Sequence, residues 1–407
     1  MNPRSAAVAT DTGGFVENKP SSRTGYIPLS VPEIGGNAWA YVKDCLDTGW
    51  VSSVGDYVKR FEHLIAESVG TRSAVATSSG TSALHVALLV SGIMPEDEVL
   101  VSTLTFIAPV NAIRYVGAWP VLMDVEPNFW QLDPQKIQDF LRKNCRYSRG
   151  KLTNRNTGRR VTAILPVHLL GHPVDMEPIV SVAREFGLLV IEDATECLGA
   201  QYRGQYAGTL GDVGCFSFNG NKIITTGGGG AIVTANDKWA ERAKYLTMQA
   251  KDDMVEFVHG EIGYNYRLTN IQAALGCAQM ERLREFIERK RAIASRYEIA
   301  LKDVPGVTPM PQAPWAESIF WLYTVLIDEQ KFGISARGLL DELEAKGIQT
   351  RPLWQPMHRS PVHRDCEAFH CDHADWLHAR ALSLPCSVGL TERQQDYIIE
   401  SVARCSR

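Results

Sequence analysis

The chain has 407 residues, of which 45% are hydrophobic and 22% charged, and a formal net charge of -4. This composition supplies a sizeable core, which favours two domains, and the charge gives no sign of a nucleic-acid or membrane surface. Nine scattered cysteines favour reduced thiols, and neither a signal-peptide pattern nor a membrane-spanning apolar run is present, so we expect a soluble, cytoplasmic protein.

The first segment, residues 1–26, is rich in small and polar residues, and we expect a flexible tail there. Beyond it, short apolar runs alternate with helical patterns such as those at 81–91, 106–117 and 176–187. The alternation is typical of βα units and predicts an α/β domain whose mainly parallel sheet has seven strands, at 73–78, 98–103, 119–125, 161–168, 188–193, 213–218 and 230–235. The last two strands are joined by too short a turn for a crossover, so we expect them to be antiparallel.

A long helical pattern then extends from Thr269 to about Leu301 and would carry the chain into a second domain. Farther on, 320–328 predicts a strand, while 334–347 and 390–405 predict helices. We therefore expect a large domain over 27–285 and a smaller α+β domain over 286–407.

One lysine occupies a polar turn between the last two predicted strands. Lys222 lies within 215–234 and is followed by four glycines at 227–230. The turn suits a lysine that forms an imine with a carbonyl compound, since glycines let the backbone approach a ligand closely. A β-hairpin with a solvated lysine is the plain alternative. The Walker pattern does not apply because it places its lysine after the glycines, and a dinucleotide fingerprint would need a helix starting at 227–230.

An acidic residue ends a buried strand upstream of this lysine. Asp193 lies in the apolar segment 188–200, at the sheet edge where open α/β folds bind their ligands. An acid there can simply cap a helix. Together with Lys222, however, it suits a carboxylate bonded to a pyridinium nitrogen.

Two further segments suit contacts to a phosphorylated aromatic ligand. In 77–92, a strand leads through Gly80, Thr81 and Ser82 into an apolar helix, whose start can hold a phosphate or can be an ordinary cap. Phe106 follows another strand, where it can stack on an aromatic ring or belong to the core.

From about Ile27 to the C-terminus, this ordered set of motifs resembles the DegT/StrS group of nucleotide-sugar aminotransferases, which have the fold-type I architecture and use pyridoxal 5'-phosphate. The resemblance implies that Lys222 carries the cofactor and that Asp193 pairs with its ring nitrogen. It also implies cofactor contacts from Gly80, Thr81, Ser82 and Ser217 at the phosphate, from Phe106 at the ring and from Glu196 beside it. The turn departs from the group's usual Gly-Glu-Gly-Gly at Gly228.

The segment 261–276 resembles the part of these enzymes that reaches into a neighbouring subunit, which implies a homodimer with shared active sites. Asn265 would then contact the partner's phosphate, and Arg267 would lie near the substrate. His168 matches a position near the pocket. Trp50 and Tyr323 are further candidates for contacts to the sugar or base, although each can equally serve packing or surface.

The resemblance implies transfer of an amino group from glutamate to a keto sugar. Segments 27–62, 216–230 and 350–358 most resemble the subgroup that acts on UDP-linked 4-keto-6-deoxy-N-acetylhexosamines in bacterial surface-glycan biosynthesis. GDP-perosamine synthases are the rival interpretation. A catalytically idle binding protein, or a dehydrating relative with histidine in place of the lysine, is disfavoured because Lys222 and Asp193 are both present.

Two stretches invite other functions. Residues 142–160 are basic but lack interleaved aromatics, so we expect a solvated loop rather than a nucleic-acid site, with a role near a sugar diphosphate as a further alternative. Residues 363–378 gather four histidines and two cysteines, yet their spacing repeats no paired zinc motif. We expect a surface helix there and no metal.

Overall fold

The computed structural model describes residues 25–148, 150–253 and 255–406. All but the last two residues of the predicted tail, 1–26, lie outside the described residues. Within them, no helix is both long and apolar enough to span a membrane.

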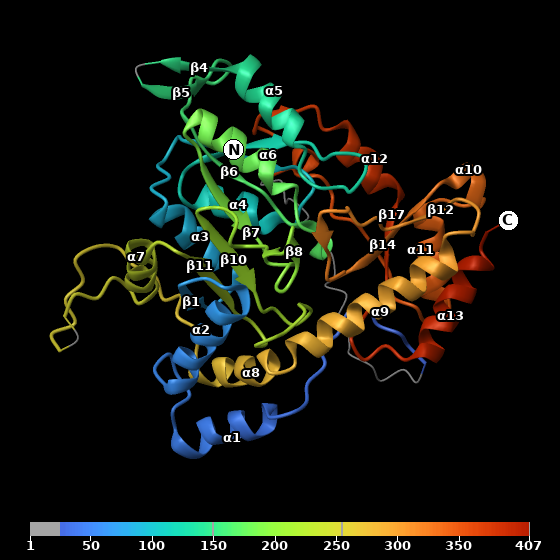
Figure 1. The fold of residues 1–407 in the computed structure, drawn as a ribbon, viewed down its shortest axis with the longest axis horizontal. Coiled ribbons are helices and arrows are strands. Elements are labelled where there is room, and N and C mark those ends of the chain that lie inside the picture. The colour runs from blue at the N-terminus through green and yellow to red at the C-terminus, as the bar shows by residue number, and fades with distance from the viewer. Residues whose placement is uncertain (1–24, 149, 254, 407) are drawn as a thin grey trace, which may run out of the picture.

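A sheet of eight strands forms the centre of the large domain (Figure 1), in the order β1-β11-β10-β7-β6-β2-β3-β16. Seven of them are the predicted strands: β1 (Ser73–Thr77), β2 (Glu98–Ser102), β3 (Trp119–Met123), β6 (Val161–Leu165), β7 (Leu189–Asp193), β10 (Val213–Ser217) and β11 (Gly230–Thr234). As expected, β10 and β11 are antiparallel, and β1 also pairs antiparallel with β11. The other pairings are parallel, so the carboxyl ends of β2, β6 and β7 lie side by side at the same end of the sheet.

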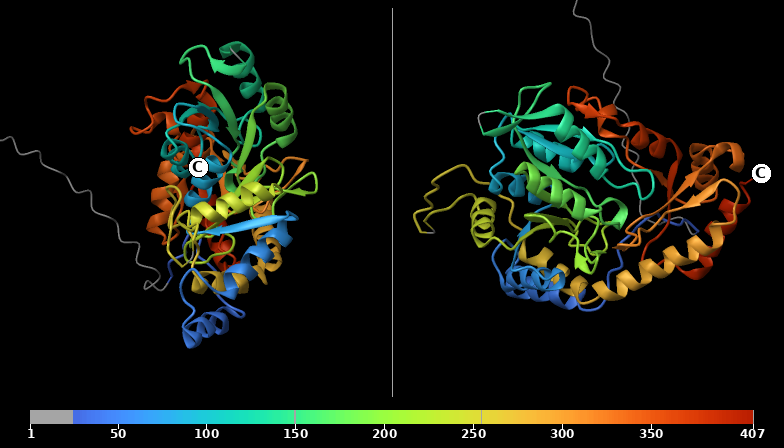
Figure 2. Two further views of the ribbon diagram at one scale, coloured as in Figure 1. Left: turned by 90° about the vertical axis from the view of Figure 1, so that its left-hand side faces the viewer. Right: turned by 45° about the horizontal axis from the view of Figure 1, so that its top comes forward.

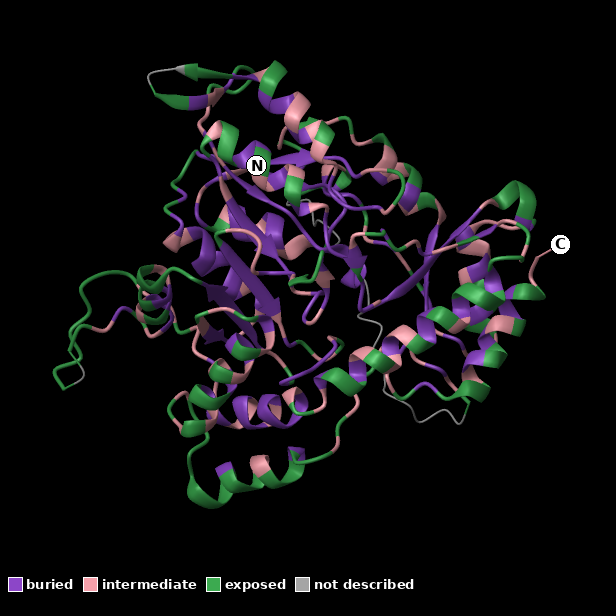
Figure 3. Cartoon of the chain, viewed as in Figure 1, coloured by how far each residue is buried: buried purple, intermediate pink, exposed green. Residues whose placement is uncertain are grey.

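Helices cover both faces of this sheet because its strands are apolar on both sides. Val99 and Val101 of β2 belong to the same core cluster as α3 (Gly80–Val90), α4 (Ile107–Tyr115) and α7 (Asp237–Thr247), whereas Leu100 between them belongs to the cluster of α5 (Pro134–Asn144) and α6 (Met176–Phe186). This alternation follows from the two-residue period of a strand. Figure 3 shows the sheet as a continuous buried layer.

The predicted long helix is wrong in one respect, since it is broken into α8 (Asn270–Met280) and α9 (Leu283–Leu301). Arg282 leaves helical geometry with φ -110° and ψ 2°. Just before it, the Glu281 carboxylate accepts hydrogen bonds from Tyr41 and Arg60, which fix the end of α8 against α1 (Ala38–Thr48) and α2 (Asp56–Val69). The break lets α9 leave in a new direction, toward the small domain (Figure 2).

The small domain contains a four-stranded sheet in the order β12-β14-β17-β15. Its strands are β12 (Val307–Pro309), β14 (Tyr323–Ile327), β15 (Arg351–Pro352) and β17 (Ala381–Leu384), with helices α10 (Glu329–Phe332), α11 (Ala336–Ala345) and α13 (Glu392–Ala403). The first described residues also join it, because Ile27 bridges to Ile348 and the Leu29 carbonyl accepts from Cys386 N–H. The division at 285 therefore stays a proposal.

Two surface stretches differ from their predicted forms. The basic segment contains an antiparallel hairpin, β4 (Cys145–Ser148) with β5 (Lys151–Asn154), instead of a plain loop. The Asn154 amide anchors this hairpin by donating to Glu98 and Glu367. In the histidine-rich stretch, helix α12 begins only at Asp372 (Asp372–Arg380), because residues before it form β16 (Ala368–Phe369) at the sheet edge.

The remaining elements are short. A three-stranded sheet consists of β13 (Ala316–Glu317), β8 (Gln201–Tyr202) and β9 (Gln205–Tyr206), and two 3-10 turns occur at η1 (Leu169–Gly171) and η2 (Met357–Arg359). The η1 turn follows β6 and contributes to the site described next.

Candidate active site

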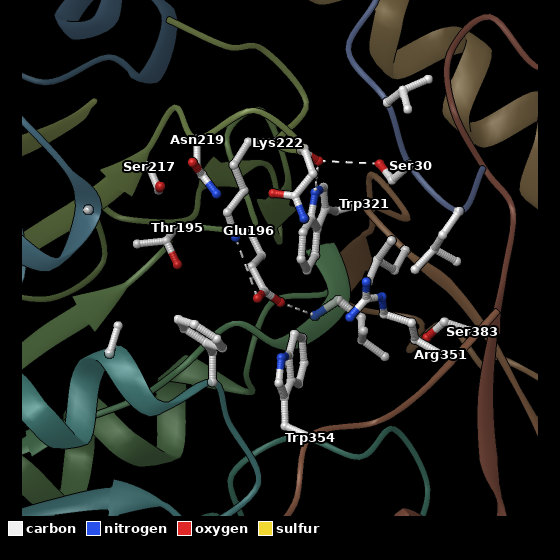
Figure 4. A pocket seen from close by; sticks show the side chains of 18 of the residues that line it. Ser30, Thr195, Glu196, Ser217, Asn219, Lys222, Trp321, Arg351, Trp354 and Ser383 are labelled. Atoms are coloured by element: carbon white, nitrogen blue, oxygen red, sulfur yellow. Dashed lines mark hydrogen bonds and ion pairs between the residues drawn. The ribbon is translucent and has the colours of Figure 1, made fainter. Parts of the chain in front are cut away.

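A cavity of about 1280 Å³ lies between the strand ends of the large domain and the β15–β17 edge of the small domain. Lys222, Glu196, Ser217 and Trp321 line it, together with Phe106, Trp354 and Arg351. Figure 4 shows several of these side chains directed into the same space. The volume is sufficient for a ligand of cofactor size with a substrate beside it.

Lys222 is placed by the turn between β10 and β11. Its N–H donates to the Asn219 carbonyl at 3.0 Å, and the Asn221 carbonyl accepts from Trp321 Nε1 at 2.7 Å. The Lys222 Nζ lies 3.9 Å from the centroid of the Trp321 ring and 3.6 Å from Glu196 Oε1. The amine is therefore held between an aromatic face and a carboxylate, at a cavity wall that largely excludes water.

Glu196 is buried beside this lysine. Burial raises the pKa of its carboxyl to about 7, although the positive charge of Lys222 acts in the opposite direction. The Leu170 N–H donates to Glu196 Oε2 at 2.8 Å. Leu170 adopts a left-handed backbone with φ 60°, which is costly for a leucine and marks a constrained turn at the site.

Asp193 ends β7 and is almost fully buried. The Thr195 N–H donates to its Oδ1 at 3.0 Å, and within the described ranges Asp193 forms no ion pair. Burial raises the pKa of Asp193, and hydrogen bonds from Thr195 lower it. A buried carboxylate in this situation is costly by itself, so a cationic ring nitrogen would relieve it.

The start of α3 faces the cavity next to β10. Ser79, Gly80 and Thr81 line the cavity together with Ser217. A Cβ added to Gly80 would meet the Cβ of Ser217 at 2.7 Å, so a glycine is what lets the helix start approach this serine. Free N–H groups at a helix start, beside hydroxyls, form a cradle that fits a phosphate.

Ser82 differs from its prediction as a phosphate contact. Its N–H donates to Ser79 Oγ at 3.0 Å, and its hydroxyl contacts Ser79 Oγ at 2.8 Å and Ser78 Oγ at 3.1 Å. The residue is buried and does not line the cavity, and its N–H donates to the side chain of Ser79, which is the N-cap of α3.

These residues fit pyridoxal phosphate. The phosphate cradle and Lys222 line one cavity, with Phe106 at its wall, and the buried Asp193 ends β7 just before the lining residues Thr195 and Glu196. The Phe106 ring is half-exposed and meets Trp354 edge-on at 6.5 Å, which leaves a face for stacking. Among the described residues, no three His, Cys, Asp or Glu side chains are grouped to hold a metal ion.

His168, a predicted substrate contact, is fully buried and does not line the cavity. Its Nδ1 accepts from Val174 N–H at 3.0 Å, so its Nε2 carries the proton and donates to Glu192 Oε2 at 2.9 Å. Glu192 also accepts N–H groups from the 208–211 turn. The pair therefore supports the strand that ends in Asp193.

Tyr323, a predicted substrate contact, does not line the cavity. Its ring stacks on Tyr297 at 5.0 Å in the small-domain core, and its buried hydroxyl has no hydrogen-bond partner among the described residues. The residue two positions earlier, Trp321, faces the cavity instead. A strand whose residues are buried on both faces carries no sequence signal for which side chain meets a ligand.

The remaining predicted residues lie outside the cavity of their own chain. Asn265 is exposed, Trp50 is 57% exposed, and Arg267 forms an ion pair with Glu62 at 2.6 Å. Asn265 belongs to an arm, residues 248–265, that projects from the large domain (Figure 1). The predicted contact of Asn265 with the partner's phosphate and the predicted position of Arg267 near the substrate stay predictions.

Sequence reasoning missed Trp321, Trp354, Asn219 and Arg351 as cavity residues. Trp354 and Arg351 lie in 350–358, and Trp321 lies in the predicted strand 320–328. A tryptophan beside a proline-rich turn was the available signal for Trp354. No local pattern separates the other three from ordinary packing or surface residues.

Comparisons with known proteins agree with this site. The chain matches the DegT/DnrJ/EryC1/StrS aminotransferase family over residues 32–403. GDP-perosamine synthase from Caulobacter vibrioides is 40% identical over 379 residues, which cover 92% of this chain and 97% of that protein. The putative pyridoxal phosphate-dependent aminotransferase EpsN from Bacillus subtilis is 38% identical over 380 residues, with 92% and 94% covered.

Among solved structures, DesI in the presence of its TDP-sugar product superposes with a TM-score of 0.84 at 28% identity, covering 95% of this chain and 94% of DesI. This likeness confirms the predicted fold-type I architecture. The family match over nearly the whole chain, together with a lysine and a phosphate cradle that line one cavity, leads to one conclusion. The chain belongs to the DegT/DnrJ/EryC1/StrS aminotransferase family and is a pyridoxal phosphate-dependent sugar aminotransferase.

Proposed function

We propose that the protein transfers the amino group of glutamate to C4 of a nucleotide-linked 4-keto-6-deoxyhexose, with Lys222 as the catalytic residue. The observation that carries this proposal is the position of the Lys222 amine, 3.6 Å from Glu196 in the cavity that also holds the α3 cradle. When bound there, pyridoxal phosphate supplies a ring that accepts the electrons left at the donor's α-carbon.

The remaining roles in the reaction belong to residues of the chain. Lys222 Nζ takes the proton from the α-carbon of the donor and later returns a proton to C4 of the sugar. Asp193 stays ionised and keeps the ring nitrogen of the cofactor protonated. Trp321 covers Lys222 and excludes water, while Thr81 and Ser217 hold the phosphate. Because donor and sugar use the same residues in turn, ping-pong kinetics are expected.

The nucleotide is the finer part of the proposal. The 40% identity to a protein named GDP-perosamine synthase, over 92% of this chain, favours a GDP-linked sugar. The resemblance of segments 27–62 and 350–358 to the UDP-sugar subgroup favours a UDP-linked 2-acetamido sugar as the second candidate. Identity over the whole chain is stronger support than the resemblance of short segments. We therefore propose the GDP-linked sugar first and the UDP-linked sugar second, which reverses the order expected from the sequence motifs.

The test is a side-by-side assay of purified protein with GDP- and UDP-linked 4-keto-6-deoxy sugars, with glutamate as donor. We expect mass spectrometry to find the 4-amino sugar, with higher kcat/KM for the GDP-linked sugar. A preference for the UDP-linked sugar would overturn the nucleotide assignment and leave the reaction intact. Bound cofactor whose absorbance does not change with glutamate would refute the reaction itself.

The homodimer with shared active sites also remains a proposal. Its support is the arm, whose apolar side chains Val255, Phe257, Val258 and Ile262 are each more than half exposed. A monomer rarely exposes so many large apolar groups together, and a second copy of the chain would cover them. Mixing Lys222→Ala with Asn265→Ala chains should restore activity, since one hybrid site keeps both residues. No recovery despite demonstrated subunit exchange would count against sharing.

A further inference from the structure

One buried lysine lies outside the cavity and has no acidic partner. Lys290 belongs to α9, the helix that leads from the large domain to the small one (Figure 1), and is only 3% exposed. Within the described residues it forms no ion pair, and its Nζ donates to the Trp321 carbonyl at 2.7 Å and contacts Cys386 Sγ at 3.4 Å. Withdrawing a lysine from water without a carboxylate beside it has a cost, and an apolar side chain would fill the same space without that cost. Stability alone therefore does not account for a lysine at this position.

Trp321 connects this buried lysine to Lys222. The indole Nε1 of Trp321 donates to the carbonyl of Asn221, the residue before Lys222, at 2.7 Å. The Lys222 Nζ lies 3.9 Å from the centroid of the Trp321 ring, and Figure 4 shows the ring beside the lysine. The carbonyl of Trp321 thus contacts Lys290 while its ring contacts Lys222. Any shift of the Trp321 backbone would move the ring that covers the amine.

The backbone just before Trp321 is strained. Phe320 has a φ of 49°, a left-handed conformation that is unfavourable for a residue other than glycine. Such a conformation persists only where the surrounding structure fixes it. The Phe320 N–H donates to Ser318 Oγ at 3.0 Å, and Gly171 of η1 lies so close that a Cβ added to it would meet Trp321 N at 2.6 Å. The hydrogen bond from Lys290 holds the end of this turn, at the Trp321 carbonyl.

We propose that Lys290 is a positioning residue, which holds the Trp321 carbonyl so that the indole stays over the Lys222 amine; this inference rests on the proposed function. Lys290 does not line the cavity and so acts through Trp321. Once the Lys222 amine is free to move the proton, the indole limits the directions in which it can turn and keeps water away from it. Without the hydrogen bond the strained turn relaxes and the ring moves, so proton transfer slows while substrate binding is retained.

The plain alternative is that Lys290 serves only to join α9 to the small domain. A joining role would lower the stability of a variant but leave the turnover of the folded, cofactor-loaded molecules unchanged. The positioning role predicts the opposite pattern, a slower proton transfer in molecules that remain folded. It also predicts that the effect depends on Trp321.

The experiment measures the donor half-reaction by stopped-flow absorbance in the cofactor-loaded enzyme. Lys290→Met keeps the length of the side chain and removes the donor. It should lower the rate constant at saturating glutamate by about 10- to 100-fold, the order of effect expected when a reacting group is misplaced by about 1 Å, and leave the half-saturating glutamate concentration unchanged. Lys290→Arg, which keeps a donor, should restore part of the rate. Lys302→Met, at an exposed position directly after α9, is the control and should match wild type.

A double-variant cycle tests the route through Trp321. In Trp321→Phe, which lacks the Nε1–H that binds Asn221, the addition of Lys290→Met should cause little further loss, because both changes release the same ring. Losses that multiply in the double variant would show that the two residues act independently and would overturn the inference.

Two controls separate folding from positioning. Rates are referred to the bound cofactor, measured by its absorbance, and thermal unfolding gives the folded fraction. If Lys290→Met does not load cofactor, Lys290→Gln replaces it, because its shorter side chain weakens the same hydrogen bond and should give the same loss of rate. A wild-type rate in the folded variants, or a raised half-saturating concentration at an unchanged rate, would overturn the inference. Failure of the wild type to react with glutamate or any other amino acid would instead refute the proposed function.

Discussion

The Lys222 amine lies 3.6 Å from Oε1 of Glu196, and both groups are largely withdrawn from water. Burial nevertheless raises the pKa of Glu196 from 4.5 to about 7, so desolvation outweighs the attraction of the lysine. The carboxyl can thus change protonation near neutral pH.

This raised pKa predicts a pH-dependent stability. The unfolded chain ionises Glu196 near pH 4.5, whereas the folded one does so near 7, so the contribution of this group to stability is complete below pH 4.5 and is lost as pH rises toward 7. At about 1.4 kcal/mol per pH unit, the loss is roughly 3 kcal/mol. The difference in the free energy of unfolding between Glu196→Gln and wild type should therefore grow by that amount, in favour of the variant, as pH rises from 4.5 to 7.

The measurement is chemical denaturation of the cofactor-free protein between pH 4.5 and 8. Glu342→Gln, at an exposed position of α11, should give a constant difference from wild type. A pH-independent difference for Glu196→Gln as well would contradict the assigned pKa.

Asp193→Asn should impair both half-reactions. The amide keeps the shape but removes the negative charge, and breaking a buried ion pair costs about 3–5 kcal/mol, or roughly 200- to 5000-fold in rate. Stopped-flow absorbance with glutamate measures the first half-reaction directly. Asp328→Asn, at the cap of α10 in the small domain, is the control. Near-normal rates in Asp193→Asn would show that this carboxylate does not serve the ring nitrogen.

Gly80→Ala should weaken cofactor binding and lower stability by about 1–3 kcal/mol, because the new Cβ would lie 2.7 Å from the Cβ of Ser217 and push the cradle apart. Equilibrium dialysis and thermal unfolding measure the two effects. Gly338→Ala in α11 is the control, since the new Cβ would lie at an ordinary contact distance of 3.4 Å from Ile334 Cβ. This variant should be slightly more stable than wild type, because alanine has a higher helix propensity than glycine. Equal behaviour of the two variants would argue against the close contact.

The alternating strands and helices of the large domain were predictable from sequence. All seven predicted strands of the large domain lie where apolar runs place them, because burial on both faces leaves a continuous signal. The break between α8 and α9 was not predictable, since Glu281 and Arg282 are good helix formers. Its position depends instead on the tertiary hydrogen bonds that Tyr41 and Arg60 donate to Glu281. The added strand β16 depends on a long-range pairing with β3 in the same way.

The residues of the site also differ in whether a local sequence pattern predicts them. Lys222, Asp193 and Gly80 have local signatures, namely a turn, a strand end and a helix start. Trp321 and Arg351 enter the cavity only because the small domain folds back onto the large one. Tyr323 packs in the small-domain core, whereas Trp321, which precedes β14, lines the cavity, and the fully buried strand gives no sequence signal that separates them.

Covalent labelling tests the central claim most directly. Borohydride reduction of the cofactor-loaded enzyme, followed by proteolysis and mass mapping, should place the reduced pyridoxyl group on Lys222 and leave Lys244 and Lys290 unmodified. Addition of excess glutamate before reduction should abolish the label, because the cofactor then leaves the lysine. A label on any other lysine, or a label on Lys222 that glutamate does not remove, would contradict the account.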